Sequence, residues 1–415
     1  MKTAGSNVEA FEINGVRVLL RQNQAHEAIA VRLMLRGGSM QLTAETAGAE
    51  LLYARAARRG TRDFPKEKLN AELDRLGIDL GASIGEDWST FHLRCLQRDV
   101  DAAWRLFLDV TLHPTLDASE LDIVREQTLL GIRQRKDSSD GALADLAREQ
   151  LYRNHPYAID PSGTESSIGG LTDTTIRAHM QSQMQRSRLL LVVVGNLQRA
   201  DLEQRVHDAF AALPQGTALP GYAAPVAFDE PALQIEEREL PTNYVMGQFA
   251  APSLADAMHP ATHMALSILR DRFFEEVRTK RNLSYAPAAG LGNHAANSGW
   301  IYVTAVDPRT TLEVMRTEMH KLGHEKLDPR DLADKVQVYL TRYHLQNETN
   351  HAQAGFLGRY ELLGGGWKQS LGFVERLEAL QPADVQAAAH QVLRNIQYTY
   401  LGNPGLFGSE DIVNP

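Results

Sequence analysis

The chain is poor in cysteine and has no long apolar segment. Cys95 is its single cysteine, which excludes an internal disulfide framework and a cysteine-rich metal site. No run of 18 or more apolar residues occurs, so the sequence predicts no transmembrane helix and no membrane partner. Cys95 lies in a stretch of alternating character, residues 91–96, and we predict a small buried strand residue there rather than a reactive thiol.

Other absences narrow the range of functions. The chain contains no Gly-x-Ser-x-Gly motif, P-loop or dinucleotide fingerprint, so nucleophilic hydrolysis and phosphate chemistry have no support. Its net charge of −9 argues against a nucleic-acid partner. Residues 1–15 lack the apolar segment of a signal peptide. We expect a periplasmic protein if a signal peptide has been removed, and a cytoplasmic protein otherwise.

A weak internal repeat divides the chain into two halves. Asp117 and Asp328 each precede a predicted helix, and they lie 211 residues apart. Two further pairs of segments follow in the same order: residues 171–173 with 380–384, and residues 189–196 with 398–403. At 415 residues the chain is also long enough for two domains. The segment between the halves is rich in proline, glycine and alanine, as extended linkers are. We therefore predict an N-terminal domain of residues 1–212, a linker of residues 213–231 and a C-terminal domain of residues 232–415.

Hydrophobic periodicity indicates the fold class of each half. Segments of period two, such as residues 15–20 and 31–35, come early and late in a half, and helical segments lie between them. One predicted helix places Leu121, Val124, Thr128 and Ile132 on a single face. This order favours an α+β fold, in which helices pack on a mainly antiparallel sheet.

Residues 48–61 read Gly-Ala-Glu-Leu-Leu-Tyr-Ala-Arg-Ala-Ala-Arg-Arg-Gly-Thr. The spacing of the glycines and the threonine resembles the inverted zinc motif of the M16 (insulinase/pitrilysin) peptidases, His-x-x-Glu-His. The resemblance puts Leu51 and Arg55 at the two histidine positions and Ala54 at the catalytic glutamate position. Leucine and alanine have no donor atom, and a guanidinium is always protonated. The motif is therefore present in outline without its zinc-binding side chains.

The third zinc ligand of that family is a glutamate on a later helix. The run 124–132, Val-Arg-Glu-Gln-Thr-Leu-Leu-Gly-Ile, corresponds to it and places Gly131 at the ligand position. Gly131 follows Arg55 by 76 residues, about the spacing that the family keeps. The resemblance thus implies that this chain binds no zinc, and that zinc belongs to a partner subunit. His320 and His324 have acceptable helical spacing for two metal ligands, but no third ligand can be placed beside them, and a solvated helix face is the simpler interpretation.

Residues 272–285 are similar to a second M16 motif, Arg-Leu-Phe-x-Glu-Val-Arg-Glu-Lys-Arg-Gly-Leu-Ala-Tyr. In the family an arginine and a tyrosine of this run bind the substrate near the scissile bond. By position they correspond to Arg278 and Tyr285. Both side chains donate hydrogen bonds to a peptide carbonyl or to the oxyanion formed on attack. Without the resemblance, a solvated arginine and a core tyrosine would be the ordinary interpretation.

The resemblance implies the M16 fold over nearly the whole chain: two homologous α+β sandwich domains that form half of a clamshell-type peptidase. It also implies two alternative functions. In the first, the chain is the non-catalytic, substrate-binding subunit of an M16B zinc metallopeptidase heterodimer that cleaves peptides or unfolded polypeptides. Its partner carries His-x-x-Glu-His. In the second, the chain is a structural protein of the same fold, similar to the core subunits of respiratory complexes, with no peptidase role.

Overall fold

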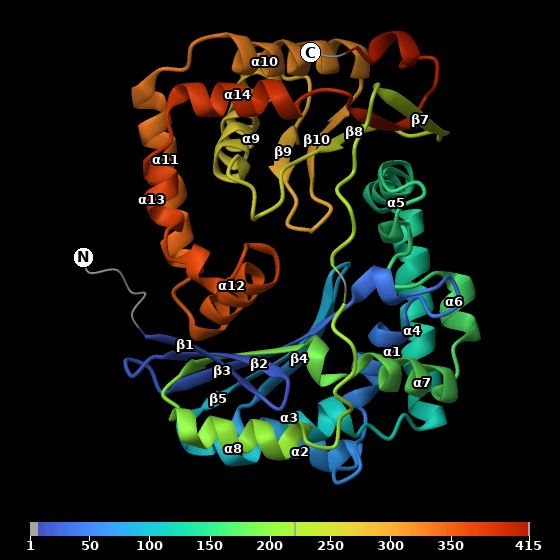
Figure 1. Ribbon diagram of the computed structural model, residues 1–415. Coiled ribbons are helices and arrows are strands. Elements are labelled where there is room, and N and C mark those ends of the chain that lie inside the picture. Colours follow the sequence, from blue (N-terminus) through green and yellow to red (C-terminus); the bar gives the residue numbers. More distant parts are fainter. Residues whose placement is uncertain (1–6, 220, 414–415) are drawn as a thin grey trace.

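The computed structural model describes residues 7–219 and 221–413 of the chain (Figure 1). The first half contains a sheet of six strands in the order β1-β2-β6-β3-β5-β4. These strands are β1 (Val8–Ile13), β2 (Val16–Gln22), β3 (Ala28–Arg36), β4 (Asp79–Ile84), β5 (Trp88–Leu96) and β6 (Leu189–Gly195). The helices of this half are α1 (Ala49–Ala57), α2 (Lys66–Leu76), α3 (Val100–Leu112), α4 (Ala118–Asp137), α5 (Ser139–Leu151), α6 (Glu165–Gly170), α7 (Asp173–Gln183) and α8 (Arg199–Phe210).

The second half contains a sheet of five strands in the order β7-β11-β8-β10-β9. These strands are β7 (Ala232–Glu237), β8 (Asn243–Ala250), β9 (Ala288–Leu291), β10 (Ser298–Ala305) and β11 (Gln397–Gly402). The helices of this half are α9 (His259–Phe273), α10 (Pro308–His324), α11 (Pro329–Gln346), α12 (Asn350–Leu363), α13 (Phe373–Glu378) and α14 (Pro382–Val392). The α+β fold class predicted from periodicity is therefore confirmed.

The two sheets repeat one topology. The order β2-β6-β3-β5-β4 of the first corresponds to β7-β11-β8-β10-β9 of the second. In each of these two five-strand orders the first pair is parallel and the remaining pairs are antiparallel. Helices α4 and α11 begin at Ala118 and Pro329, which are 211 residues apart. The sequence repeat thus reflects a structural repeat, and among the described residues β1 of the first sheet has no counterpart in the second.

Local sequence explains where these helices begin and which face they bury. Asp328 accepts a hydrogen bond from the Arg330 amide, and Pro329 follows at the first helical position, so α11 begins with a capped turn. Asp117 holds the same place before α4. The buried residues of α4 are those predicted from the helical spacing: Leu121, Val124, Thr128 and Ile132.

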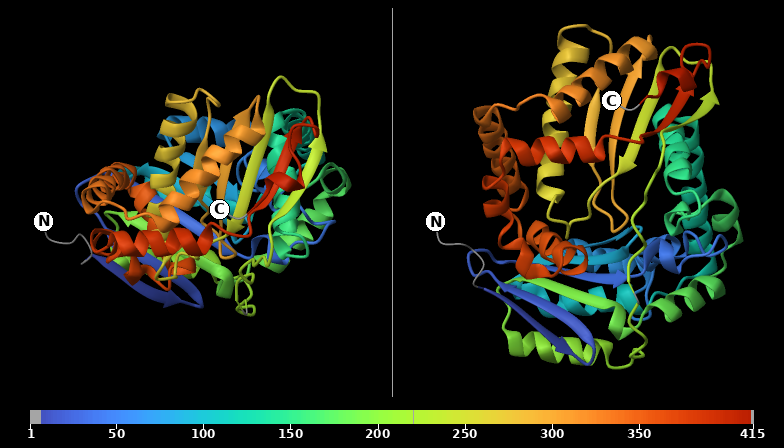
Figure 2. Two further views of the ribbon diagram at one scale, coloured as in Figure 1. Left: turned by 90° about the horizontal axis from the view of Figure 1, so that it is seen from above. Right: turned by 45° about the horizontal axis from the view of Figure 1, so that its top comes forward.

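Each half contributes a helix to the sheet of the other half. Helix α12 packs on β3 and β6 of the first sheet, and α5 packs on β8 and β11 of the second (Figures 1 and 2). A Cβ atom at Gly358 of α12 would lie 2.5 Å from the Met34 sulfur, so glycine is what lets the helix approach β3 closely. The domain bounds predicted from sequence stay a prediction. Each of these two helices lies within one predicted domain in the sequence but packs on the sheet of the other. Residues 1–6, 220 and 414–415 of the predicted domains and linker lie outside the described residues.

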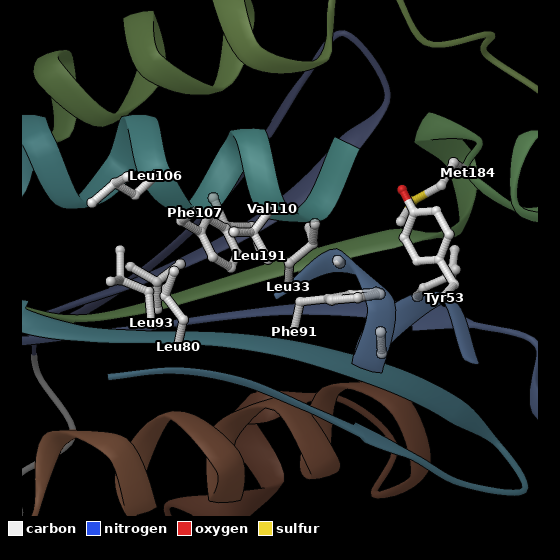
Figure 3. Packing of buried hydrophobic residues seen from close by; sticks show 14 of the residues in the cluster. Leu33, Tyr53, Leu80, Phe91, Leu93, Leu106, Phe107, Val110, Met184 and Leu191 are labelled. Carbon is white, nitrogen blue, oxygen red and sulfur yellow. The ribbon is translucent and has the colours of Figure 1, made fainter. Parts of the chain in front are cut away.

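The opposite face of the first sheet forms the core of that half. Figure 3 shows Leu33, Phe91, Leu93 and Leu191 of the sheet packing against Phe107 and neighbouring side chains of α3. Among the described residues, no helix is both long enough and apolar enough to cross a bilayer.

Cys95 lies in this core and supports a first prediction. The thiol is on β5 with 5% of the residue exposed, and burial raises its pKa to about 12. Each pKa unit is a tenfold change in the thiolate fraction, so at neutral pH we expect a thiolate population about a thousandfold below that of a free cysteine. Alkylation of the native protein should therefore be very slow and become fast on unfolding in urea. Rapid alkylation without urea would contradict the buried placement.

The two halves also meet through a pair of equivalent hairpins. Asp87, in the turn between β4 and β5, accepts hydrogen bonds from the Tyr157 hydroxyl and from the Ala295 amide at 3.1 Å. Ala295 lies in the corresponding turn between β9 and β10. His294 Nδ1 lies 3.6 Å from a Glu86 oxygen and 3.7 Å from an Asp87 oxygen. The junction therefore places an imidazole of one half against two carboxylates of the other.

Protonation of His294 should strengthen this junction. Burial lowers the pKa of His294, and the positive charge of Arg148 lowers it further. The hydrogen bond to Asp87 and the negative charges of Glu86 and Asp87 raise the pKa by more, so the net shift of the His294 pKa is upward. A raised pKa in the folded state means stabilisation that is fully present below the unfolded value, about 6.5, and is lost as the pH rises through the folded value.

We expect the free energy of unfolding of wild type to exceed that of His294→Gln by less than about 1 kcal/mol, because the side chain is partly exposed. Urea unfolding of both proteins between about pH 5.5 and 8.5 should show the difference shrinking toward high pH. A difference that grows with pH would refute the assignment.

Candidate functional site

The residues at the expected zinc positions lie on α1 and α4, which pack against each other. Leu51 is half-buried, Ala54 is buried and Arg55 is exposed. The Arg55 guanidinium donates a hydrogen bond to Thr128 Oγ1 of α4 at 2.7 Å. Gly131 lies almost one turn after Thr128, and a Cβ atom there would meet nothing within 4 Å. The two helices therefore face each other, as a metal site between two helices requires. The positively charged Arg55 side chain connects them where the metal would lie in the family.

This donor set does not fit zinc. A hydrolytic zinc site needs imidazole or carboxylate ligands and an open position for water. Two of the four positions carry aliphatic side chains, one carries no side chain and the fourth carries a fixed positive charge. That the chain holds no zinc stays a prediction from this chemistry, and no catalytic step follows from these residues.

Glu50, next to Leu51, is a buried carboxylate that the sequence analysis missed. It accepts a hydrogen bond from the Ser89 hydroxyl, and its other oxygen lies 3.3 Å from His179 Nε2. All three residues are more than nine-tenths buried. The only sequence signal was an acidic residue within an apolar helix. The cluster joins α1 to β5 and α7 beneath the degenerate site, and its two partners satisfy both oxygens of the carboxylate.

His320 and His324 stack on each other on α10, with ring centroids 4.2 Å apart. His324 Nδ1 lies 3.0 Å from the His320 carbonyl oxygen. Within residues 7–219 and 221–413, no group of three or more histidine, cysteine or acidic side chains has an arrangement that could hold a metal ion. The structure thus brings no third ligand to this pair.

Arg278 and Tyr285 come together in the second half. Arg278 lies in a π-helix, Phe274–Thr279, that continues α9, and Tyr285 follows before β9. The Arg278 Cζ atom lies 3.9 Å from the centroid of the Tyr285 ring and 4.7 Å from that of Phe274. Both rings are exposed, Tyr285 to 77% and Phe274 to 46%. The family motif indicated the arginine and the tyrosine, whereas Phe274, in the same run of residues, carried no sequence signal for this contact.

The neighbouring charges leave the Arg278 donors available. Glu276 pairs with Lys280 at 2.6 Å and also with Arg281. Hydrogen bonds from Lys280 and, to a smaller extent, from Arg281 lower the pKa of Glu276 to about 2. This carboxylate therefore stays ionised and paired with Lys280 and Arg281 rather than with Arg278. Within the described part of the chain, the Arg278 guanidinium makes no hydrogen bond and no ion pair, whereas the backbone carbonyl of this residue accepts a hydrogen bond from the Asn282 amide at 3.1 Å. A guanidinium held by ring faces with free N–H groups can donate two parallel bonds to a carbonyl or carboxylate.

The degenerate zinc positions and the Arg278–Tyr285 pair do not form one site within the chain. Helices α1 and α4 belong to the first half, whereas the π-helix contacts α10, which lies on the side of the second half remote from the first sheet (Figure 1). A substrate bound at the pair would need its reacting partner from outside this chain.

Two family descriptions match the chain. Residues 17–165 match "Insulinase (Peptidase family M16)", and residues 170–339 match "Peptidase M16 inactive domain". The chain is also similar to the crystal structure of a peptidase M16 inactive domain from Pseudomonas fluorescens. That similarity has a TM-score of 0.87 and 22% identity, and it covers 96% of this chain and 98% of the other.

Several curated proteins are similar in sequence. An uncharacterized zinc protease of Mycobacterium leprae is 23% identical over 400 residues, which cover 91% of this chain and 87% of that protein. The mitochondrial-processing peptidase subunit beta of Blastocladiella emersonii is 21% identical, over 59% of this chain and 53% of its own length. The mouse mitochondrial cytochrome b-c1 complex subunit 1 is also 21% identical, over 62% of this chain and 54% of its own length. The relatives therefore include both a named peptidase subunit and a respiratory-complex subunit.

Proposed function

Because the chain belongs to the M16 peptidase family, we propose that it is the non-catalytic, substrate-binding subunit of a heterodimeric zinc metallopeptidase. The observation that carries the proposal is the exposed Arg278–Tyr285 stack, whose guanidinium has no acceptor in the described part of the chain. The chain lacks zinc-binding side chains at Leu51, Arg55 and Gly131, and it lacks the catalytic glutamate at Ala54. A peptide held at this pair would therefore be cleaved by the zinc of another chain.

In this proposal each residue of the pair has a defined task. The Arg278 guanidinium donates hydrogen bonds to the carbonyl oxygen of the bound peptide, and the Tyr285 hydroxyl donates a further one. Donors already aimed at that oxygen stabilise the negative charge that develops on it when water attacks. A partner subunit with the His-x-x-Glu-His motif supplies the zinc-activated water and the general base.

Peptides or unfolded polypeptides are the substrate class that such a site would serve, because the pair recognises main-chain groups. The similarity to a mitochondrial-processing peptidase subunit supports assembly with a second subunit. Purification of the tagged chain from its own cells should therefore recover a second M16 chain with an intact zinc motif in equal amount. Metal analysis of the isolated chain should find far less than one zinc per molecule. Stoichiometric zinc in the isolated chain would overturn the proposal.

A second candidate is a structural subunit with no peptidase role. The similarity to cytochrome b-c1 complex subunit 1 favours it. Under this alternative, Arg278 and Tyr285 contribute nothing to peptide binding. Both candidates predict copurification with other subunits. They differ in the effect of substituting Arg278, which under the structural alternative leaves every activity of the complex unchanged.

A further inference from the structure

Comparison of the two sheets identifies an open edge in the second. In the first sheet, β2 is covered along its outer edge by β1, which pairs with it antiparallel from Val8–Arg21 to Ile13–Val16. Strand β7 holds the place of β2 in the second sheet, and it is the outermost strand there (Figures 1 and 2). The second sheet has no counterpart of β1 within the described residues.

One exposed residue of β7, Ile235, shows what a strand in the place of β1 would cover. Gly195 and Gly402 end the matching strands β6 and β11 with nearly equal φ angles, 153° and 155°. Two residues before each glycine, Val193 pairs with Leu20 of β2, and Tyr400 pairs with Ile235 of β7. Leu20 and Ile235 are therefore equivalent positions. Leu20 is fully buried, whereas Ile235 is 40% exposed.

The outer edge of β7 also has unpaired backbone groups. The Ala232 amide donates to the Ile396 carbonyl at 3.3 Å, and the Arg238 amide donates to the Gly402 carbonyl at 3.1 Å. The even-numbered residues therefore face β11, and alternation turns the N–H and C=O groups of Leu233, Ile235 and Glu237 outward. Those outward groups have no hydrogen-bond partner among the described residues. An edge of this kind is a template for another strand.

The chain before β7 cannot cover this edge, because it is held elsewhere. In the first half, a tight turn at Asn14 and Gly15 folds β1 back onto β2. In the second half, the corresponding segment is the linker, which follows the junction of the halves. Tyr222 stacks on Arg36 at 4.2 Å, and the Phe228 carbonyl accepts a hydrogen bond from Asn395 at 2.7 Å.

Charge at this edge indicates the chemistry of its occupant. Residues 229–239 contain the acidic residues Asp229, Glu230, Glu236, Glu237 and Glu239, with Arg238 the single basic residue. Arg238 pairs with Glu236 at 2.7 Å, which leaves the segment strongly negative. A strand with lysine or arginine at alternate positions would gain favourable cross-strand charge pairs here, whereas a second copy of β7 would bring like charges to the edge.

We propose that the outer edge of β7 binds an extended basic segment of another polypeptide, which adds to the sheet antiparallel as β1 does in the first half. Main-chain hydrogen bonds to Leu233, Ile235 and Glu237 supply the binding, and the acidic residues select a basic partner. This edge is separate from the Arg278–Tyr285 pair, so the proposal does not depend on the peptidase assignment.

Amide hydrogen exchange with a synthetic peptide tests the proposal. The probe is a capped peptide of roughly eight residues that alternates valine and lysine, long enough to span β7. At a peptide concentration about ten times Kd, exchange at the amides of Leu233, Ile235 and Glu237 should slow about elevenfold. The even-numbered amides, already bonded to β11, should not change. A matching peptide with glutamate in place of lysine should bind much more weakly.

Two controls separate strand addition from other binding. Ile235→Pro removes an outward N–H, a change that an edge strand tolerates, and it should abolish the protection, whereas Ile235→Thr keeps the N–H and should retain it. Because a proline variant could fail to fold, the wild-type chain is also tested with a peptide N-methylated at alternate residues, which should not bind. The proposal is wrong if the basic peptide gives no protection, if the N-methylated peptide protects equally, or if sedimentation shows that the chain pairs with itself through β7.

Discussion

An Arg278→Ala subunit, assembled with the zinc-bearing partner, is expected to support peptide cleavage about a hundredfold more slowly than wild type. This magnitude is typical of removing one donor that binds a developing oxyanion. Most of the loss should appear in kcat, because the donor acts most strongly on the charge that develops during attack. Tyr285→Phe keeps the ring against the guanidinium, 3.9 Å away, and removes only the hydroxyl. We expect it to lose less activity than Arg278→Ala. Steady-state kinetics with a fluorogenic peptide measure both effects.

The matched control is Arg133→Ala, which removes an exposed arginine paired at 3.2 Å with Glu165. Exposed ion pairs contribute little, so this variant should keep nearly the full rate. The substrate-binding role would be wrong if Arg278→Ala and Arg133→Ala behaved alike while both assembled normally with the partner. Assembly has to be measured separately, by gel filtration of each mixture, because a weaker complex would also lower the rate.

Restoring zinc binding should require all three ligand positions, Leu51, Arg55 and Gly131, and Ala54→Glu restores the catalytic glutamate between them. The variant Leu51→His/Ala54→Glu/Arg55→His is expected to bind zinc weakly and to remain inactive, because Gly131 leaves the metal one ligand short. Adding Gly131→Glu should raise the zinc content to about one per chain. The structure supports this expectation, since α1 and α4 already face each other through the Arg55–Thr128 hydrogen bond. A Cβ atom at Gly131 also enters open space.

Metal analysis after dialysis, with wild type and the triple variant as controls, gives the outcome directly. Circular dichroism and urea unfolding of each variant show whether the fold survives the loss of the Arg55 contact. If a folded fourfold variant binds no more zinc than wild type does, the correspondence of Leu51, Arg55 and Gly131 to the family's zinc ligands is wrong.

Local features of the fold were predictable because they depend on short-range chemistry. The helix start at Asp328 follows from capping, and the buried face of α4 follows from helical spacing. Asp117 precedes α4 as predicted, although its side chain makes no capping hydrogen bond. The repeat was predictable for the same reason, since equivalent helix starts carry similar residues. The exchange of α5 and α12 between the sheets was not predictable, because the residues of a helix do not indicate which sheet the helix packs against.

For the candidate site, the residues were predictable from sequence but their contacts were not. A resemblance of motif identified Arg278 and Tyr285, but not that Lys280 and Arg281 engage Glu276 and leave Arg278 without an acceptor. The open edge of β7 depends on pairing between distant strands, and the sequence of β7 alone does not reveal it. Glu50 was missed because its partners, Ser89 and His179, come from distant parts of the chain.

We propose that this chain completes a peptidase whose zinc lies in another subunit. The most direct test is peptide cleavage by this chain, by the copurifying chain with the intact zinc motif, and by their equimolar mixture. We expect this chain alone to be inactive, the zinc-bearing chain alone to be nearly inactive, and the mixture to cleave at least about a hundredfold faster than either. A zinc-bearing chain that cleaves as fast alone as in the mixture, or a stable but inactive complex, would contradict this proposal.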